Sequence, residues 1–184
     1  MIRGDLAPYL FVKMIQYLEI GKIVTTHGVN GEVKVYISAD SPESLYHVKR
    51  VYLNASATVG LDVVSHRKVK NMLLLRFDGI SSIEDAHGLI GKTLWADRNE
   101  IRKDKDSFFI VDLIGLEVVH ATTGEHIGVI GDVLSGGVQD LYSVKLDSGK
   151  SCLVPAVPAF VKKTSLEEKK VWIEPIKGLF DDAD

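Results

Sequence analysis

Before residue 98, apolar and polar residues mostly alternate with a period of two, a pattern typical of half-buried β-strands. Residues 33–37 are the clearest case, with valine or isoleucine at each odd position and lysine or tyrosine at each even one. Further strands are predicted at residues 51–53, 61–65, 72–77 and 93–96. A short helix is predicted at residues 83–89, where Ser81 or Ser82 can cap it and two acidic residues suit its positive end. Several short strands with one helix predict a small closed β-barrel.

A glycine-bounded stretch, THGVNG at residues 26–31, precedes the clearest strand. Asn-Gly is a strong hairpin signal because both residues tolerate positive φ, so Gly28 and Gly31 are predicted to be structural turn residues. Glycine-rich loops can also cradle phosphates, but this one leads into a strand rather than a helix, and the chain has no GxxxxGK[ST] string. The stretch is therefore not a nucleotide-binding loop. Lys70-Asn71 is predicted to turn the chain before the strand at 72–77.

The chain divides at a charged segment. Residues 97–107 read DRNEIRKDKDS, in which eight of eleven residues are charged, so this segment is predicted to be a solvated linker between two domains. Behind it, strands are predicted at 116–119, 127–133, 141–146, 151–154 and 171–174, which again indicates an all-β barrel. The predicted parts are an extension (1–14), a first domain (15–98), a linker (99–106), a second domain (107–180) and an acidic tail (181–184).

Composition narrows the functional classes. The 184 residues are 46% hydrophobic and 26% charged, and no apolar stretch is long enough to predict a membrane span. The single cysteine, Cys152, excludes an internal disulfide and fits a reducing cytosol. A formal net charge of −3 does not predict a polyanion-binding protein as a whole. The front half has a slight basic excess, concentrated in HRKVK at residues 66–70, for which the plain alternative is a solvated hairpin tip.

Residues that could carry catalysis or bind a metal are sparse. The six histidines show no HxxxH, HxH or HExxH spacing, so no metal site is predicted. His120 and His126 bracket a predicted hairpin loop and can face each other, but they lack a nearby third ligand. Cys152 lies in a predicted strand with nothing nearby to lower its pKa, which favours a structural cysteine. A catalytic triad can assemble from distant positions, so a small β-barrel enzyme using Cys152 or a histidine site stays open as the alternative function.

Two apolar segments of the second half are candidate binding surfaces. Phe108-Phe109 follows the linker directly, and neighbouring residues of a strand point to opposite faces, so one ring is predicted to be core and the other exposed. Residues 153–161 are apolar throughout and contain Pro155 and Pro158, which predicts an ordered loop outside the central ladder. The alternatives are that the pair is ordinary core and that the loop is a lid on the barrel. Exposed apolar patches of this kind indicate a protein partner.

A series of motifs resembles the ribosome maturation factor RimM family. The first are IGKIV at 20–24, THGVNGEVKV at 26–35, SIEDA at 82–86 and LIGK at 89–92. FFIVDLIGLEV at 108–118, Gly124-Glu125, Gly128, Asp132-Val133, LVPAVP at 153–158 and Gly178-Leu179 follow in order. The resemblance covers roughly residues 17–180, both predicted domains and the linker between them.

The resemblance implies a fold and a function. It implies two small β-barrels, a six-stranded barrel like those of translation factors followed by a PRC-type barrel. It also implies a non-catalytic cytoplasmic assembly factor for the head of the small (30S) ribosomal subunit, which assists processing of the subunit's RNA. The implied partners are ribosomal RNA and the head protein numbered nineteen, contacted largely through the second domain. No cofactor, membrane or small-molecule substrate is implied, and we expect a monomer.

The resemblance also suggests which residues bind. Phe108, Phe109, Pro155 and Pro158 are the expected contacts to the ribosomal protein. The family commonly has two adjacent tyrosines where this chain has Phe108-Phe109, so binding here would rely on packing without hydroxyl hydrogen bonds. The expected RNA contacts are His27, Lys34, Arg67, Lys68 and Lys70, through phosphates. Residues 1–13 lie outside the family pattern.

Overall fold

The computed structural model describes residues 15–38, 42–103, 107–135 and 138–175. The predicted extension (1–14), the end of the linker, the motif at residues 178–179 and the acidic tail (181–184) lie outside these ranges. The chain divides into two compact units between Asp106 and Ser107, called unit 1 and unit 2 below and each described by itself. None of the helices in the described ranges has the length and apolar character needed to cross a bilayer.

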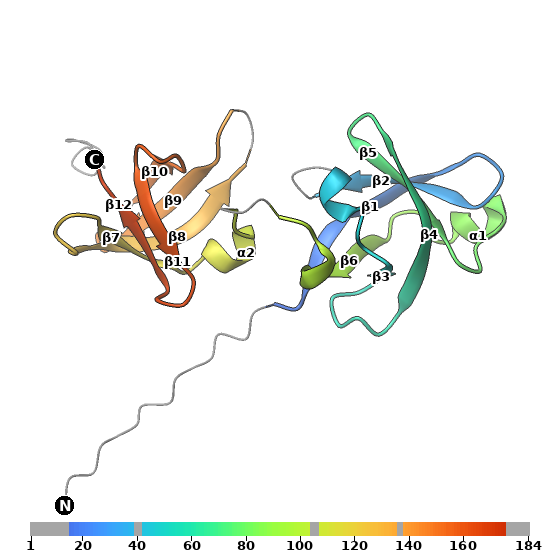
Figure 1. Cartoon of the computed structure of the whole chain (residues 1–184), viewed down its shortest axis with the longest axis horizontal. Coiled ribbons are helices and arrows are strands. Elements are labelled where there is room, and N and C mark those ends of the chain that lie inside the picture. The colour runs from blue at the N-terminus through green and yellow to red at the C-terminus, as the bar shows by residue number, and fades with distance from the viewer. Residues whose placement is uncertain (1–14, 39–41, 104–106, 136–137, 176–184) are drawn as a thin grey trace, which may run out of the picture. The chain divides into compact units, whose positions relative to one another are not determined.

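Unit 1 is a closed six-stranded barrel (Figure 1). Its strands follow each other around the barrel in the order β1-β2-β5-β4-β3-β6. Their bounds are β1 Tyr17–His27, β2 Glu32–Ile37, β3 Arg50–Tyr52, β4 Gly60–Val69, β5 Met72–Phe77 and β6 Thr93–Asp97. Three short helices accompany them: η1 Pro42–Leu45, α1 Ile83–His87 and η2 Arg98–Glu100. Every strand predicted for this half is present.

The core of unit 1 follows from the alternation in its strands. Val33 and Val35 of β2 pair in register with Leu75 and Leu73 of β5, and all four side chains are buried. The helix α1 forms where it was predicted because the Ser82 hydroxyl accepts a hydrogen bond from the Asp85 amide. These inward-facing residues form the first hydrophobic core.

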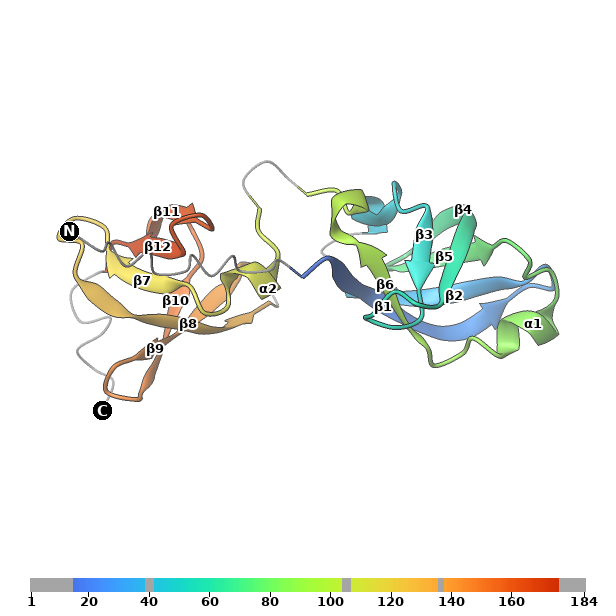
Figure 2. The same ribbon diagram turned by 90° about the horizontal axis from the view of Figure 1, so that it is seen from below.

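Unit 2 is a six-stranded sheet with its own core (Figure 2). Its strands are β7 Glu117–His120, β8 His126–Leu134, β9 Leu141–Leu146, β10 Ser151–Pro155, β11 Val161–Ser165 and β12 Lys170–Ile173, preceded by the helix α2 Ile110–Leu113. The order β10-β9-β8-β7-β12-β11 places β10 and β11 at the two edges. Only the β7–β12 pair is parallel. With these strands in both halves, the all-β fold class is confirmed.

The turn between β1 and β2 has the backbone conformation that its glycines predict. Gly28 and Gly31 have φ values of +64° and +75°, in the left-handed region that favours glycine. The two positions differ in their surroundings. A Cβ atom on Gly31 would lie 2.5 Å from the carbonyl oxygen of Ile80, whereas a Cβ atom on Gly28 would meet nothing within 4 Å. Gly31 is thus required both by its backbone angle and by the close approach of the chain before α1.

The structure differs from the sequence predictions in several places. The pattern did not predict β1, β11 or α2. Irregular register around Gly21 and Val24 interrupts the alternation of β1, and β11 is mostly polar. The prediction that Phe108 and Phe109 are neighbouring residues of a strand is wrong, because Phe109 is the N-cap residue of α2.

Part of the predicted linker belongs to the barrel. The Glu100 carboxylate accepts a hydrogen bond of 2.8 Å from the Lys49 amide, and the Arg102 amide donates to the Ser44 carbonyl. Ile101, the one apolar residue in the charged segment, packs against the core of unit 1. One apolar side chain and hydrogen bonds to backbone groups of the barrel hold this segment in place.

We expect Gly31→Ala to destabilise unit 1 more than Gly28→Ala. A left-handed alanine costs about 1–2 kcal/mol, which is the expected effect at Gly28. At Gly31 the clash with Ile80 adds to it, for a total of roughly 3 kcal/mol or more. The measurement is urea unfolding followed by Trp95 fluorescence in a Trp172→Phe background. Equal losses at the two positions would contradict the close approach of Ile80.

Candidate functional site

Four neighbouring strands of unit 1 share an outward-facing surface. The register aligns Lys34 of β2 with Leu74 of β5, and Leu74 with Arg67 of β4, so these three side chains point to the same side of the sheet. Their strand neighbours Leu73 and Leu75 belong to the core, so this row faces outward. At a strand spacing of about 4.8 Å, Lys34 and Arg67 are roughly 10 Å apart across the sheet.

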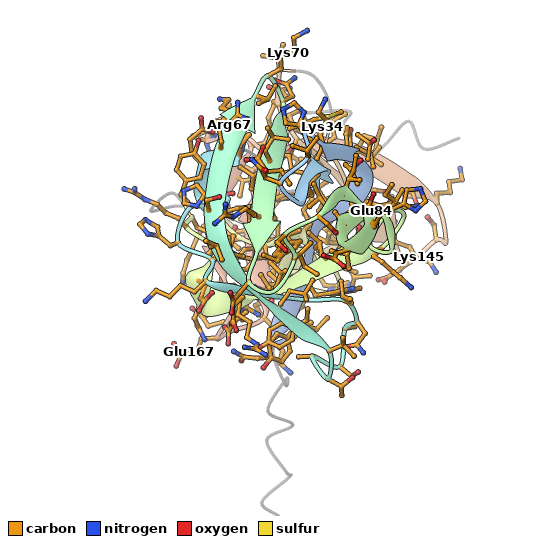
Figure 3. All side chains as sticks on the ribbon, turned by 90° about the vertical axis from the view of Figure 1, so that its right-hand side faces the viewer. Lys34, Arg67, Lys70, Glu84, Lys145 and Glu167 are labelled. Atoms are coloured by element: carbon orange, nitrogen blue, oxygen red, sulfur yellow. The ribbon has the colours of Figure 1, made fainter. Side chains whose placement is uncertain are left out.

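We call the outward residues of these strands the basic face. They are Lys22, Thr25 and His27 of β1, Glu32, Lys34 and Tyr36 of β2, Met72, Leu74 and Arg76 of β5, and Ser65, Arg67 and Val69 of β4, with the acidic residues Glu19 and Asp62 facing outward near the ends of β1 and β4. Figure 3 shows Lys70 at the tip of the β4–β5 hairpin, with Arg67 and Lys34 below it. Lys70 has a φ of +57°, which confirms the predicted turn at Lys70-Asn71.

The basic face has an excess of unpaired positive charge. Its central carboxylate, Glu32, lies 3.7 Å from the guanidinium of Arg67, while Glu19 and Asp62 lie near the ends of their strands, where Asp62 pairs with Arg50. Within the described ranges, Lys22, Lys34, Lys70 and Arg76 form no ion pair. Such a surface attracts a polyanion even though the whole chain is slightly acidic.

Lys68 does not join the basic face. It is paired with Leu73, a core residue, and therefore points to the opposite side of β4 from Arg67. Its ammonium group donates a 2.6 Å hydrogen bond to Glu43 of η1, and this bond raises the pKa of Lys68. On the same side of the strand, the ring of His66 stacks on Tyr46. The predicted cluster of residues 66–70 is therefore divided between two faces.

His27 lies at the edge of the basic face. It is the last residue of β1, it is exposed, and it pairs with Glu32 across the turn. Gly28 follows it in the exposed part of the turn. The structure thus brings His27, Lys34 and Arg67 onto one surface, with Lys70 at its tip, and leaves out Lys68.

The first candidate surface of unit 2 surrounds α2. Phe108 is half-buried and packs against the core, and Phe109 is also half-buried, so neither ring is fully exposed. Sequence reasoning missed the neighbouring residues Ile110, Val111 and Ile114, whose side chains are 37–45% exposed. The sequence could have indicated their exposure, because the apolar run that contains them is longer than one short helix can bury.

The prolines lie on different parts of unit 2. Pro155 is the last residue of the edge strand β10 and pairs with Leu141 of β9, which pairs with Leu134 of β8. Leu134 and Leu153 are exposed, so this outer surface is apolar. The end of β8, whose last residue is Leu134, lies beside α2 in Figures 1 and 2. Pro158 is exposed in the loop after β10, and its carbonyl accepts a hydrogen bond from Lys162.

The surroundings of the cysteine and the histidines suggested for catalysis do not resemble a catalytic pocket. A recess of about 370 Å³ in unit 1 has neither histidine nor cysteine in its wall, which consists of Asn30, Val64, Arg76, Phe77, Asp78, Gly79, Ile80 and Ser81. Burial raises the pKa of the Cys152 thiol, which makes it a poorer nucleophile. Across the described ranges, no three metal-binding side chains gather in one place.

His120 and His126 are held by different partners. The ring of His120 accepts hydrogen bonds from the amides of the loop that follows it. The ring of His126 contacts the carboxylates of Glu117 at 3.1 Å and Asp147 at 3.3 Å, and Glu117 also lies 3.3 Å from Lys170. The hydrogen bond to Glu117 raises the pKa of His126, and the same bond lowers the pKa of Glu117. His126 is thus part of an ion-pair network joining β7, β8 and β12.

Comparisons with known proteins match both units. The family described as the RimM N-terminal domain matches residues 18–101, and the RimM PRC barrel domain matches residues 110–179. The ribosome maturation factor RimM of Acetivibrio thermocellus is 40% identical over 173 residues, covering 92% of this chain and 99% of the relative. The ribosome maturation factor RimM of Clostridioides difficile is 35% identical over 168 residues, covering 91% of this chain and 98% of the relative. A crystal structure of a RimM protein from Pseudomonas aeruginosa is 25% identical, with a TM-score of 0.42 over 87% of this chain and 98% of that one.

The network around His126 predicts a pH dependence of unit 2 stability. Because the folded-state pKa of His126 is raised above 6.5, its contribution is fully present below pH 6.5 and is lost as the pH rises through the folded pKa. The Glu117 pKa is lowered, so its contribution is present above pH 4.5 and is lost on acidification below that value. Stability from this network is therefore greatest between these two values.

The test compares the original chain with His126→Gln, using Trp172 fluorescence in a Trp95→Phe background. We expect the free energy of unfolding to fall above pH 6.5 in the original chain and to stay flatter in the variant. The loss on acidification should remain in both, because Glu117 keeps Lys170. Parallel curves above pH 6.5 would mean that His126 does not contribute through its charge.

Proposed function

This chain belongs to the RimM family of ribosome maturation factors, and from that membership we propose that it assists assembly of the head of the small (30S) ribosomal subunit and processing of its RNA. In this proposal it acts in the cytoplasm as a non-catalytic monomer with two binding domains, residues 15–98 and 107–180. The observation that carries the proposal is that both family domains match in order along one chain, one on each compact unit.

Unit 2 would bind the head protein numbered nineteen. This part of the proposal is supported by a set of partly exposed apolar residues, Phe109, Ile110, Val111, Ile114 and Leu134. Binding interfaces are energetically dominated by a few aromatic or aliphatic side chains that become fully desolvated. Phe109 is the aromatic member of this surface, and Phe108 supports it from the core side. Pro155 would extend the contact along the outer side of β10, while Pro158 lies in the loop beyond it.

Unit 1 would bind ribosomal RNA through phosphates. The basic face and Lys70 offer cationic groups on a convex sheet, and these groups are largely free of internal ion pairs. Contacts of this kind position RNA without reading its sequence. His27, at the β1–β2 turn, would contact the phosphates of the same RNA segment. The two surfaces together would let one chain hold a protein and an RNA segment of the same maturing particle.

The first test replaces each phenylalanine singly by alanine. Because Phe108 packs on the core, we expect Phe108→Ala to lower the stability of unit 2 by about 2 kcal/mol. We expect Phe109→Ala to weaken binding to the head protein by about thirtyfold, equivalent to ~2 kcal/mol, with little loss of stability. Melting temperature and affinity are measured together for both variants. If neither variant loses more affinity than its unfolded fraction explains, the pair is core and unit 2 binds elsewhere.

The second test measures the salt dependence of RNA binding. Removing three cations with Lys34→Gln, Arg67→Gln and Lys70→Gln should reduce the slope of log affinity against log salt by up to about 2, because each phosphate neutralised on a single strand contributes ~0.7 to the slope. Lys68→Gln is the matched control, since Lys68 faces Glu43 and should not contribute. An unchanged slope in the triple variant would remove the basic face from the proposal.

A further inference from the structure

Among the described residues of unit 1, the most exposed aromatic ring lies on the basic face. Tyr36 of β2 is 59% exposed, although β-sheet tyrosines usually pack against cross-strand neighbours. Its neighbours in register are Lys22 of β1 and Met72 of β5. Within the described ranges, no aromatic ring or cation stacks on the Tyr36 ring. The ring is therefore an open apolar plane.

Cations flank this ring along the strand and across it. Lys34 lies two residues away on the same face, at about 6.6 Å along the strand, and Lys22 lies directly opposite on β1. Arg76 and Lys70 add two further cations at the two ends of the β4–β5 hairpin. Glu32 lies on the far side of Lys34 from Tyr36, 3.7 Å from Arg67. On the other side of Tyr36, the carboxylate of Glu19 of β1 accepts a hydrogen bond from the Ser38 hydroxyl, so the positive charge lies on the side of Lys22 and Lys34. A ligand lying over Tyr36 therefore meets positive charge.

The surface between these cations has an apolar centre. Leu74 points outward in the row between Lys34 and Arg67, yet it is only 1% exposed. Lys34 and Arg67 flank Leu74 in register, and long side chains of this kind lay their methylene stems over apolar surface while keeping their charged ends in water. An apolar floor with charged ends above it suits a ligand that combines a planar apolar part with anionic groups.

An unpaired nucleotide has this combination of properties. Its base can stack on an aromatic ring while its phosphates contact lysine and arginine, and stacking accepts any base because every base has a π-face. In a duplex both faces of each base are already covered by neighbouring bases. A surface that bound RNA only through phosphates would not need the ring, so Tyr36 favours single-stranded RNA over duplex RNA.

We propose that the basic face binds unpaired RNA, with one base stacked on Tyr36 and the adjacent phosphates held by Lys22 and Lys34. This assignment rests on the proposed RNA-binding function of unit 1 and specifies its ligand as a single-stranded segment. Arg67 and Arg76 would follow the backbone across β5 and β4. From the sequence, Tyr36 is only one of the outward-facing residues of an alternating strand. Its proposed role becomes visible only when the register places Lys22 beside it.

The experiment measures binding of two RNA probes by fluorescence anisotropy. One is a twelve-nucleotide labelled single strand without self-complementarity, and the other is the same strand annealed to its complement. The proteins are the full chain and three variants: Tyr36→Ala, Tyr36→Phe and, as a matched control for loss of an exposed apolar side chain, Val59→Ala. Val59 is 50% exposed and lies outside the strands of the basic face. A melting curve for each protein checks that it is folded.

We expect the chain to bind the single strand more tightly than the duplex. Tyr36→Ala should weaken single-strand binding about tenfold, within the range of one stacked base, and leave duplex binding and the salt slope unchanged because no charge is removed. Tyr36→Phe should retain most of the affinity, and Val59→Ala should behave like the original chain. A 5-iodouridine in the single strand should crosslink to the peptide that contains Tyr36 on irradiation.

The failures of the two proposals are distinguishable. Salt-dependent binding that Tyr36→Ala does not weaken, or equal binding of single strand and duplex, would overturn the stacking assignment and leave phosphate binding by unit 1 intact. A loss in Val59→Ala as large as that in Tyr36→Ala would also overturn it. Failure of the chain to bind either RNA at low salt would overturn both this assignment and the proposed RNA-binding function.

Discussion

The register of β5 between β2 and β4 is the constraint on which unit 1 depends. It places Leu73 and Leu75 in the core and Leu74 outside, between Lys34 and Arg67. A slip of β5 by one residue would turn Leu74 and Arg76 of this strand toward the barrel interior, where an unpaired charge is very costly. The same hydrogen-bonded pairing therefore builds the core and sorts the charges onto one surface. Fold and binding surface cannot vary independently in this unit.

Unit 2 obtains its exposed apolar surface in a different way. Its helix α2 has four residues, and only Leu113 among them is buried. A helix that short covers the core with one side chain, so Ile110 and Val111, together with Ile114 after it, stay partly exposed. The core itself is completed by buried strand residues such as Val118 and Val171, which pair in the parallel β7–β12 ladder. Exposure around α2 is thus compatible with a well-packed core beneath it.

Most of the strands could be predicted from the sequence, but only some of the residues of the two candidate binding surfaces could. The alternation in β2 predicted both its strand and its inward residues, because a period of two is a local property. The separation of Arg67 from Lys68 was also readable, since adjacent strand residues face opposite ways. The Lys68–Glu43 contact was not, because Glu43 comes from a short 3₁₀ helix far back in the chain. Phe109 was misread because a single helical turn has too few residues to show a helical period.

The position of Pro155 has a consequence for self-association. The Ala156 amide donates to the Asp140 carbonyl on the β9 side, and successive amides of a strand alternate in direction, so the nitrogen of Pro155 faces the open edge of β10. Proline has no N–H there, and the ladder to β9 keeps all its hydrogen bonds. The opposite edge strand, β11, carries Lys162 and Lys163. An open sheet edge invites the addition of a further extended chain, and the missing donor of Pro155 makes such addition at β10 unfavourable. On β11 both ammonium groups are held within unit 2, that of Lys163 by Glu168 and that of Lys162 by the Pro158 and Ala159 carbonyls, so the protection lies at β10.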